Sequence, residues 1–375
     1  MRRFVSLFSI LALTAFIGCE QLENPNAPVD QDAIRKPQPN QQTDRLDKPN
    51  TTDLKFNSDE TKAKLEAVIA QAQGMVNQYK AQHPPKQANP MALSKPRILN
   101  VPGVYATIQD AVDDAKPGDE IEVEGGTYNE TVIVITPNIE IKGDMDEEDE
   151  EITVNGAFVV GGADGVEIEH FNIIPTNPIV GIIVLGSSNV EITGNTISGA
   201  GAFLGILLFA GNNCIVKENK VSDTFLGIVL VTSNGNTLDA NTAKGNVAGM
   251  LLIGIIFGPS VDDNNIKNNI CDDNLAAGIA LIGAADNKLS GNSCNRNISG
   301  SGAGIGIFLA LASQNTIGPN NIANGNDALG LWLASGADNN TVKKNTFRRN
   351  TILDILNEGL GNKFKSNKAK NTSGV

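Results

Sequence analysis

Histidine is nearly absent from this chain of 375 residues, which has only His83 and His170. Metal sites built on histidine, and mechanisms that need a histidine base, bring such side chains together with other ligands or acids. These two lie in different segments, and no two Cys or His residues stand at the spacing of metal ligands. The sequence therefore predicts no metal site built on His or Cys and no histidine-based catalysis.

Cysteine is scarce as well, with four residues. Besides Cys19 there are Cys214, Cys271 and Cys294, an odd number that cannot form a closed disulfide framework. Cys271 and Cys294 fall at equivalent positions of the repeat described below. Side chains in register on parallel strands suit disulfide geometry poorly, so we expect buried thiols, with a bridge between these two as the alternative.

Basic residues are outnumbered, with 29 Lys and Arg against 42 Asp and Glu and a net charge of −13. This balance argues against a nucleic-acid partner, and it opposes the binding of uronate polymers unless basic residues cluster locally. One cluster exists near the C-terminus: Lys343, Lys344, Arg348, Arg349, Lys363, Lys365, Lys368 and Lys370. It is either a binding patch or a set of charges that keeps an exposed end of the fold from pairing with another chain.

A repeat runs through the second half of the chain. Eight times between residues 189 and 367 an Asn is followed by three or four residues, a second Asn, a turn and a short apolar run. The second Asn residues are Asn195, Asn219, Asn241, Asn269, Asn292, Asn320, Asn345 and Asn367. Their steps of 24, 22, 28, 23, 28, 25 and 22 residues are typical of a solenoid.

The aligned units indicate coils of three short strands, because runs of about four alternating residues are separated by Asn and Gly turns. We expect the second Asn residues to stack as a ladder, about 4.8 Å apart, at a corner whose left-handed backbone Asn tolerates. Two columns are predicted to face the core. They are Ile197, Val221, Ala243, Cys271, Cys294, Ile322, Phe347 and Ala369, and Ile192, Val216, Leu238, Ile266, Leu289, Ile317, Val342 and Phe364.

Residues 106–132 read ATIQDAVDDAKPGDEIEVEGGTYNETV. This stretch resembles the opening of the pectin-lyase-like superfamily, and the later coils resemble the repeats of the periplasmic copper-maturation protein of nitrous oxide reductase. The resemblance implies an all-β fold, a right-handed parallel β-helix of about ten three-strand coils, over residues 97–375. This scaffold hosts lyases, hydrolases, esterases, epimerases and non-enzymes, so the resemblance implies no single activity.

Two helices are expected outside the coils. Residues 107–116 form a short amphipathic helix, ended by Pro117 and Gly118, that can plug the N-terminal end of the solenoid. Residues 58–83 form a longer amphipathic helix that Ser58 can cap. Its apolar stripe consists of Leu65, Val68, Ile69, Ala72, Val76 and Tyr79.

The N-terminus is predicted to carry an export signal. Arg2 and Arg3 precede an apolar run that is too short to span a bilayer and ends in Gly18-Cys19. This resembles a bacterial lipoprotein signal, with residues 1–18 removed and Cys19 lipidated; a plain secretory signal or an uncleaved anchor is the alternative. Residues 19–57 are predicted to be a disordered tether, and residues 84–96 a Pro-rich linker.

One face of the solenoid is predicted to lack polar residues. If the residue after each strand-opening Gly points inward, two outward rows are entirely apolar. They are Ile183, Leu207, Val229, Leu251, Ala280, Phe308 and Trp332, and Leu185, Phe209, Val231, Ile253, Ile282, Ala310 and Ala334. We name these two rows the apolar strip, which is too large to be left bare on a soluble monomer.

Three covers for the apolar strip remain open: the helix of residues 58–83, a partner protein or second copy, and a lipid or sugar ligand. At 1.5 Å per residue the helix is about as long as the strip, which favours cover within one chain. If a ligand or partner binds there instead, Phe209, Phe308 and Trp332 are the candidate binding residues.

Candidate catalytic residues are few. Counting from the ladder Asn places Lys244 and Asp272 in one outward column, and Asp273 and Arg296 in the next. Acids and bases side by side can serve catalysis, although cross-strand charge pairs are also ordinary features of sheets.

An acidic run offers the other candidate site. Carboxylate oxygens are the preferred ligands of calcium, so an ion could bind at Asp144, Asp146, Glu147 and Glu148. The run lacks the spacing of a known calcium loop, and a solvated loop is the alternative.

These observations predict a non-catalytic, lipid-anchored β-helix protein of the bacterial cell envelope that binds or scaffolds. The expected contacts are the membrane, through Cys19, and a polysaccharide or envelope protein, with self-association through the apolar strip as a further possibility. The alternative is a polysaccharide lyase, or a hydrolase or epimerase on the same fold. The active-site signatures of pectin methylesterases, polygalacturonases and mannuronan epimerases are absent from the sequence.

Overall fold

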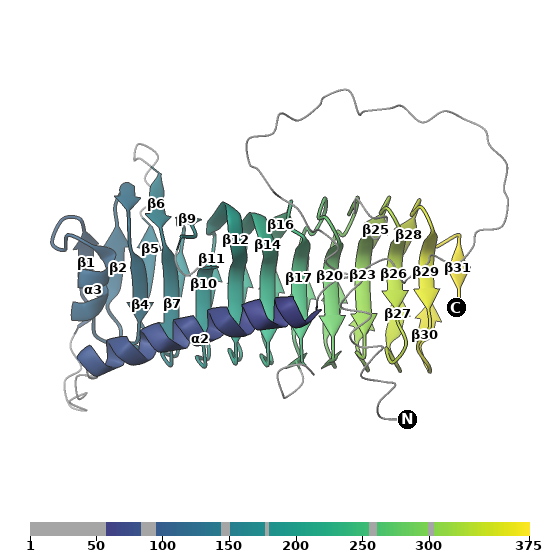
Figure 1. Ribbon diagram of the computed structural model, residues 1–375, viewed down its shortest axis with the longest axis horizontal. Coiled ribbons are helices and arrows are strands. Elements are labelled where there is room, and N and C mark those ends of the chain that lie inside the picture. Colours follow the sequence, from purple (N-terminus) through teal and green to yellow (C-terminus); the bar gives the residue numbers. More distant parts are fainter. Residues whose placement is uncertain (1–57, 84–94, 144–150, 177–179, 255–260, 299–303) are drawn as a thin grey trace, which may run out of the picture.

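The computed structural model describes residues 58–83, 95–143, 151–176, 180–254, 261–298 and 304–375. They form a parallel solenoid with one short helix at its N-terminal end and one long helix laid along its side (Figure 1). The predicted parallel β-helix with two helices is therefore confirmed. The expected tether, the acidic run at residues 144–150 and Cys19 lie outside the described residues.

One sheet has twelve strands, each contributed by a successive coil. In spatial order they are β1 (Ile98–Val101), β2 (Glu120–Val123), β5 (Glu140–Gly143), β8 (Glu167–Glu169), β11 (Glu191–Thr193), β13 (Ile215–Lys217), β15 (Thr237–Asp239), β19 (Asn265–Lys267), β22 (Lys288–Ser290), β24 (Thr316–Ile317), β27 (Thr341–Lys343) and β30 (Lys363–Lys365). All neighbours pair in parallel, so equivalent residues of successive coils form straight columns.

The second large sheet has fifteen strands and forms the other two sides of each coil. They are β3 (Gly126–Tyr128), β4 (Thr131–Val134), β6 (Ile152–Asn155), β7 (Ala157–Gly161), β9 (Asn172–Ile174), β10 (Val180–Leu185), β12 (Thr196–Phe209), β14 (Lys220–Val231), β16 (Thr242–Lys244), β17 (Ala248–Ile253), β20 (Ala277–Ile282), β23 (Ile305–Ala310), β26 (Leu329–Leu333), β29 (Leu353–Asn357) and β31 (Thr372–Ser373). Two short pairs complete the coils: β18 (Val261–Asp262) with β21 (Ala284–Ala285), and β25 (Ile322–Asn324) with β28 (Thr346–Arg348).

Asparagine ladders stabilise the corners of the solenoid. The predicted ladder is present: Asn269 Oδ1 accepts hydrogen bonds from Asn241 N at 2.9 Å and from Asn241 Nδ2 at 3.0 Å. Asn269 Nδ2 donates to Leu238 O at 2.9 Å. Each buried amide thus satisfies backbone groups that turn away from the sheets at the corner.

One predicted member of this ladder is wrong. Asn292 bonds to Asn321 rather than to Asn320, and Asn321 bonds onward to Asn345. The turn after Ile317 is one residue longer than its equivalent after Leu289, so every later residue of that coil shifts by one place. For the same reason the inward residue is Ala323, while Ile322 is 42% exposed.

The backbone conformation of the ladder also differs from the expectation. The left-handed residue is the one before the ladder Asn, such as Gly194 (φ 68°), Ala240 (φ 56°) or Asn320 (φ 66°). The ladder Asn follows that bend, which aims its amide along the solenoid axis. The preference of Asn for left-handed backbone therefore does not explain why Asn occupies the ladder position.

Two further Asn ladders occupy the other corners and were not predicted. One runs through Asn236, Asn264, Asn287, Asn315, Asn340 and Asn362. The other runs through Asn246, Asn274, Asn297, Asn326 and Asn350, where Asp354 ends it. The signal was in the sequence, because these residues recur about five places before and five places after the predicted ladder.

The helices lie where the sequence predicts them. α3 (Ile108–Asp114) is capped by Thr107, and it buries Ile108, Ala111 and Val112 against the first coils. α2 (Ser58–Gln82) runs along the second sheet and contacts β4, β7 and β10 (Figure 1).

The stripe of α2 and the apolar strip form one hydrophobic cluster, which includes Leu65, Val76, Ile183 and Leu207. Gly161 lets the helix approach the sheet closely, because a Cβ at this position would come within 2.5 Å of Val76 Cγ1. Of the three possible covers, the structure has the helix of the same chain over the N-terminal part of the strip, where α2 contacts β10. No helix in the described ranges is both long and apolar enough to cross a membrane.

Candidate functional site

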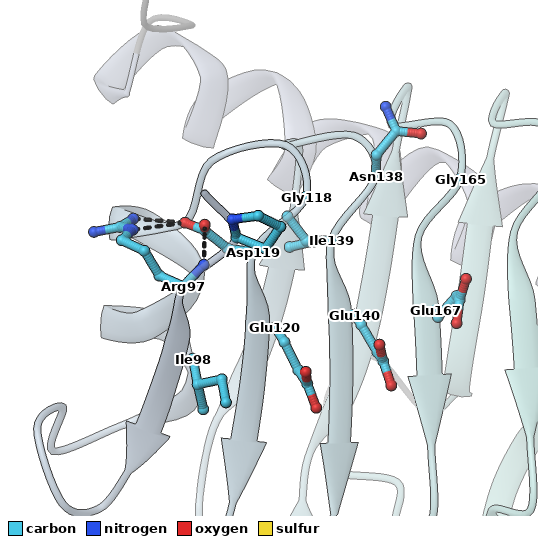
Figure 2. A pocket seen from close by; sticks show the side chains of 11 residues that line it. Arg97, Ile98, Gly118, Asp119, Glu120, Asn138, Ile139, Glu140, Gly165 and Glu167 are labelled. Atoms are coloured by element: carbon cyan, nitrogen blue, oxygen red, sulfur yellow. Dashed lines mark hydrogen bonds and ion pairs between the residues drawn. The ribbon is translucent and has the colours of Figure 1, made fainter. Parts of the chain in front are cut away.

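The candidate site lies on the outer surface of the twelve-stranded sheet, near its N-terminal end. A depression of about 360 Å³ opens there, between β1, β2, β5 and β8 (Figure 2). Outward side chains of these strands line it, including Glu120, Glu140 and Glu167, and Arg97 and Asp119 close one end.

Arg97 and Asp119 form the rigid end of the depression. Arg97 Nε donates to Asp119 Oδ2 at 3.0 Å, and Arg97 Nη1 donates to Asp114 Oδ2 at 2.9 Å. Burial opposes the charge of Asp119, but Arg97 and the backbone N–H of Lys116 outweigh it and lower the pKa of this carboxyl. The hydrogen bonds of Arg97 link α3 to β1 and β2. The carboxylates of Asp114 and Asp119 are therefore already paired with Arg97.

A row of carboxylates follows the sheet away from Arg97. Glu120 pairs in register with Glu140, Glu140 with Glu167, and Glu167 with Glu191. Lys142 lies within ion-pair distance of Glu120, but no cation of the described residues does so for the other three. Glu140, Glu167 and Glu191 therefore stand about 4.8 Å apart along the sheet without an ion pair to a described residue.

The environment of this row changes its titration. Burial, and then the charges of Glu167, Glu169 and Glu122, raise the pKa of Glu140. Burial, and then Glu191 and Glu169, raise the pKa of Glu167. Neighbouring carboxylates with raised pKa values can act as general acids, and they also attract cationic groups.

The row was missed at the sequence level because the Asn repeat begins only at residue 189. A signal was present in the dipeptide Glu-Ile, which opens four successive strands of the sheet at Glu120, Glu140, Glu167 and Glu191.

The far end of the same surface is basic. The outward residues of β22, β27 and β30 include Lys288, Lys343, Lys363 and Lys365. No carboxylate of the described residues lies within ion-pair distance of these four. We call the whole outer surface of the twelve-stranded sheet the charged face, because it changes from acidic at β2–β11 to basic at β22–β30.

The predicted catalytic candidates lie on a different side of the solenoid. Arg296 binds Asp273 through Nε at 2.8 Å and Nη2 at 2.9 Å, and it reaches Asp272 Oδ2 at 3.4 Å. Asp272 is buried and also accepts hydrogen bonds from Ser293 and Asn295. Lys244 lies in the coil next to them without an ion pair to a described residue. These contacts are those of a local ion-pair network at a corner.

The aromatic candidates belong to the apolar strip. Phe308 and Trp332 pack with ring centroids 5.0 Å apart, and Trp332 Nε1 donates to Glu358 Oε2 at 3.1 Å. Phe209 is partly buried against the same cluster. They contribute to the packing of this face.

Comparison with protein families decides the relationship. Residues 148–374 match the family described as periplasmic copper-binding protein (NosD), which is more than half of the chain. The protein belongs to the NosD family. No curated protein sequence matches it.

Solved structures similar to this NosD-family chain are parallel β-helix proteins. DFA-IIIase from Arthrobacter chlorophenolicus, without its lid, has a TM-score of 0.50 and 13% identity over 72% of this chain and 94% of that one. The periplasmic alginate epimerase AlgG has a TM-score of 0.44 and 12% identity over 72% and 83%. An alginate lyase from Paenibacillus has a TM-score of 0.47 and 17% identity over 74% and 99%. At such identities the likeness shows the fold alone.

Copper is the metal that the family description implies, and the described residues do not fit it. Cys271 and Cys294 are fully buried in the core, and burial raises the pKa of the Cys294 thiol, which disfavours the thiolate that binds metal. His83 follows α2 and His170 stands at a corner, so they lie on separate elements. Among the residues that the structure describes, no three His, Cys, Asp or Glu side chains are grouped to hold a metal ion.

Proposed function

We propose that this NosD-family protein is a non-catalytic, lipid-anchored β-helix of the cell envelope that binds a protein partner on its charged face. The observation that carries the proposal is the charged face itself, on which Glu140, Glu167 and Glu191 in the acidic half and the four lysines of the basic half have no ion pair to a described residue. Like charges in adjacent register repel one another, which is unfavourable unless a partner of opposite charge compensates them.

A protein fits this surface better than a carbohydrate. Sugar rings are commonly held by stacking on aromatic side chains, and the outward positions of the twelve described strands carry none. The charged positions instead suit Lys, Arg, Asp and Glu side chains of a protein. A periplasmic family and the apolar N-terminal run both support placement in the envelope.

Lipidation of Cys19 is the proposed means of anchoring. Replacing Cys19 with Ala is expected to move the mature protein from the membrane fraction to the soluble periplasmic fraction, because a lipid-modified cysteine supplies the membrane affinity. The measurement is fractionation together with incorporation of a labelled fatty acid. Unchanged fractionation without fatty-acid incorporation would refute the anchor and leave the rest of the proposal standing.

The second candidate function is that of an enzyme that acts on polysaccharides. The raised pKa values of Glu140 and Glu167 in the depression favour it. The non-catalytic proposal predicts no unsaturated uronate and no new reducing ends when the purified protein is incubated with alginate, polygalacturonate or β-glucans. Turnover that is lost in Glu140→Gln or Glu167→Gln, yet kept in the matched variant Asp239→Asn outside the depression, would establish the enzyme instead.

A further inference from the structure

The charged face is complementary to itself when one copy is turned around. Its strands are numbered one to twelve from β1 to β30, and β13 and β15 are the sixth and seventh. Acidic residues dominate the second to fifth strands, and lysines without an ion pair to any residue that the structure describes occupy the ninth, eleventh and twelfth. The charge thus reverses about the middle of the sheet.

A twofold axis that runs parallel to the strands, between β13 and β15, would relate the two copies. The sixth strand of one copy would then lie opposite the seventh strand of the other, the fourth opposite the ninth, and the second opposite the eleventh. Glu167 on the fourth strand then faces Lys288 on the ninth, since both residues open their strands. Glu122 on the second strand faces Lys343 on the eleventh, and both stand in the other outward column. The two copies meet as an isologous pair, in which each contact occurs twice.

The opposite orientation is unfavourable. If the two solenoids ran in the same direction, the acidic strands of one copy would lie opposite the acidic strands of the other, with Glu167 against Glu169, which costs free energy through like-charge repulsion. Charge therefore selects the antiparallel arrangement.

One apolar residue lies near the centre of the charged face, beside the point where the axis would pass. Ile215 on β13 is 38% exposed, and it is the sole large apolar residue among the outward positions of the second to twelfth strands described. Interfaces typically have an apolar centre with a charged rim, and Ile215 has that position between the acidic and the basic halves.

From these features we infer that the partner of the charged face is a second copy of this chain, bound antiparallel across β13 and β15. The inference rests on the proposed function and names its partner. Eleven spacings of about 4.8 Å make the face roughly 53 Å long, and a width of about 10 Å gives roughly 500 Å² per copy. This is small for an interface, so the dimer is weak and depends on concentration.

The test is sedimentation velocity of the mature chain at up to about 100 μM protein, because small interfaces of this kind associate weakly. A monomer–dimer equilibrium is expected in low salt, and salt of about 0.5 M should weaken it by screening the rim charges. Ile215→Asp should weaken association at least about tenfold, or 1.4 kcal/mol. Ile270→Asp is the matched control, because Ile270 is also 38% exposed but lies on another side of the solenoid.

A charge exchange makes the test specific to the arrangement. Lys288→Glu should weaken the dimer, and adding Glu167→Lys to it should restore association, since the pair is then reversed rather than lost. A monomer under all conditions would overturn the inference, as would equal effects of Ile215→Asp and Ile270→Asp. If the protein is monomeric and inactive on polysaccharides, the dimer inference is wrong and the non-catalytic proposal stands. If the protein is dimeric and active on polysaccharides, the dimer inference stands and the non-catalytic proposal is wrong.

Discussion

Replacing Asn269 with Ala is expected to lower the stability of the solenoid by about 3 to 6 kcal/mol. The substitution leaves Asn241 N and Leu238 O without these partners and Asn241 Nδ2 with only its hydrogen bond to Val216 O, and each unsatisfied buried group costs about 1 to 3 kcal/mol. Because the ladder runs from coil to coil, the substitution removes hydrogen bonds that join one coil to the next. Urea unfolding followed by circular dichroism measures the shift in midpoint.

Asn265→Ala is the control for the ladder prediction. Asn265 lies four residues earlier on β19, and it points outward and is partly exposed. Its removal is expected to change stability by less than about 0.5 kcal/mol, the usual range for surface substitutions. Equal effects of the two variants would show that the ladder does not stabilise the coils.

Two charges in the buried stripe of α2 are expected to release the helix from the apolar strip. Val68 and Ile69 are each 5% exposed against the strip. The double variant Val68→Asp/Ile69→Asp would bury unpaired carboxylates, so the helix should detach and leave the strip in water, at a cost of about 25 cal/mol for each Å² exposed. Increased fluorescence of a hydrophobic dye and aggregation at micromolar concentration are the expected results.

Ala67→Asp/Ala70→Asp is the matched control for the helix, because both alanines are on its exposed side. The control should remain monodisperse at low concentration and bind little dye. If both double variants bind dye equally, the added charge and not the loss of cover is responsible. If neither does, the helix is not what keeps the strip from water.

The repeat made much of the fold predictable. Residues such as Leu238 and Ile266 were placed inward by column, and both are fully buried. The outward apolar rows, including Leu207 and Phe308, were also predicted correctly. These assignments succeeded because strand alternation and a stacked register are local rules that repeat in every coil.

The failures occurred where a local rule was interrupted. The shift from Asn320 to Asn321 came from one extra residue in a turn, which a count of residues cannot detect without the register. The carboxylate row was missed because β2, β5 and β8 precede the Asn repeat, and their alignment depends on loops of unequal length. Candidate sites depend on which residues of distant coils become neighbours, so they are less predictable than the core.

Zero-length carbodiimide cross-linking followed by mass spectrometry tests most directly whether the charged face binds a second copy antiparallel. Glu167 and Lys288 are five strands apart within one chain, about 24 Å, so a direct bond between them must join two copies. The account predicts a Glu167–Lys288 cross-link in the covalent dimer, with mixed isotope labels when labelled and unlabelled protein are combined. A covalent dimer joined elsewhere, with no cross-link between the acidic and basic halves of the charged face, would contradict it.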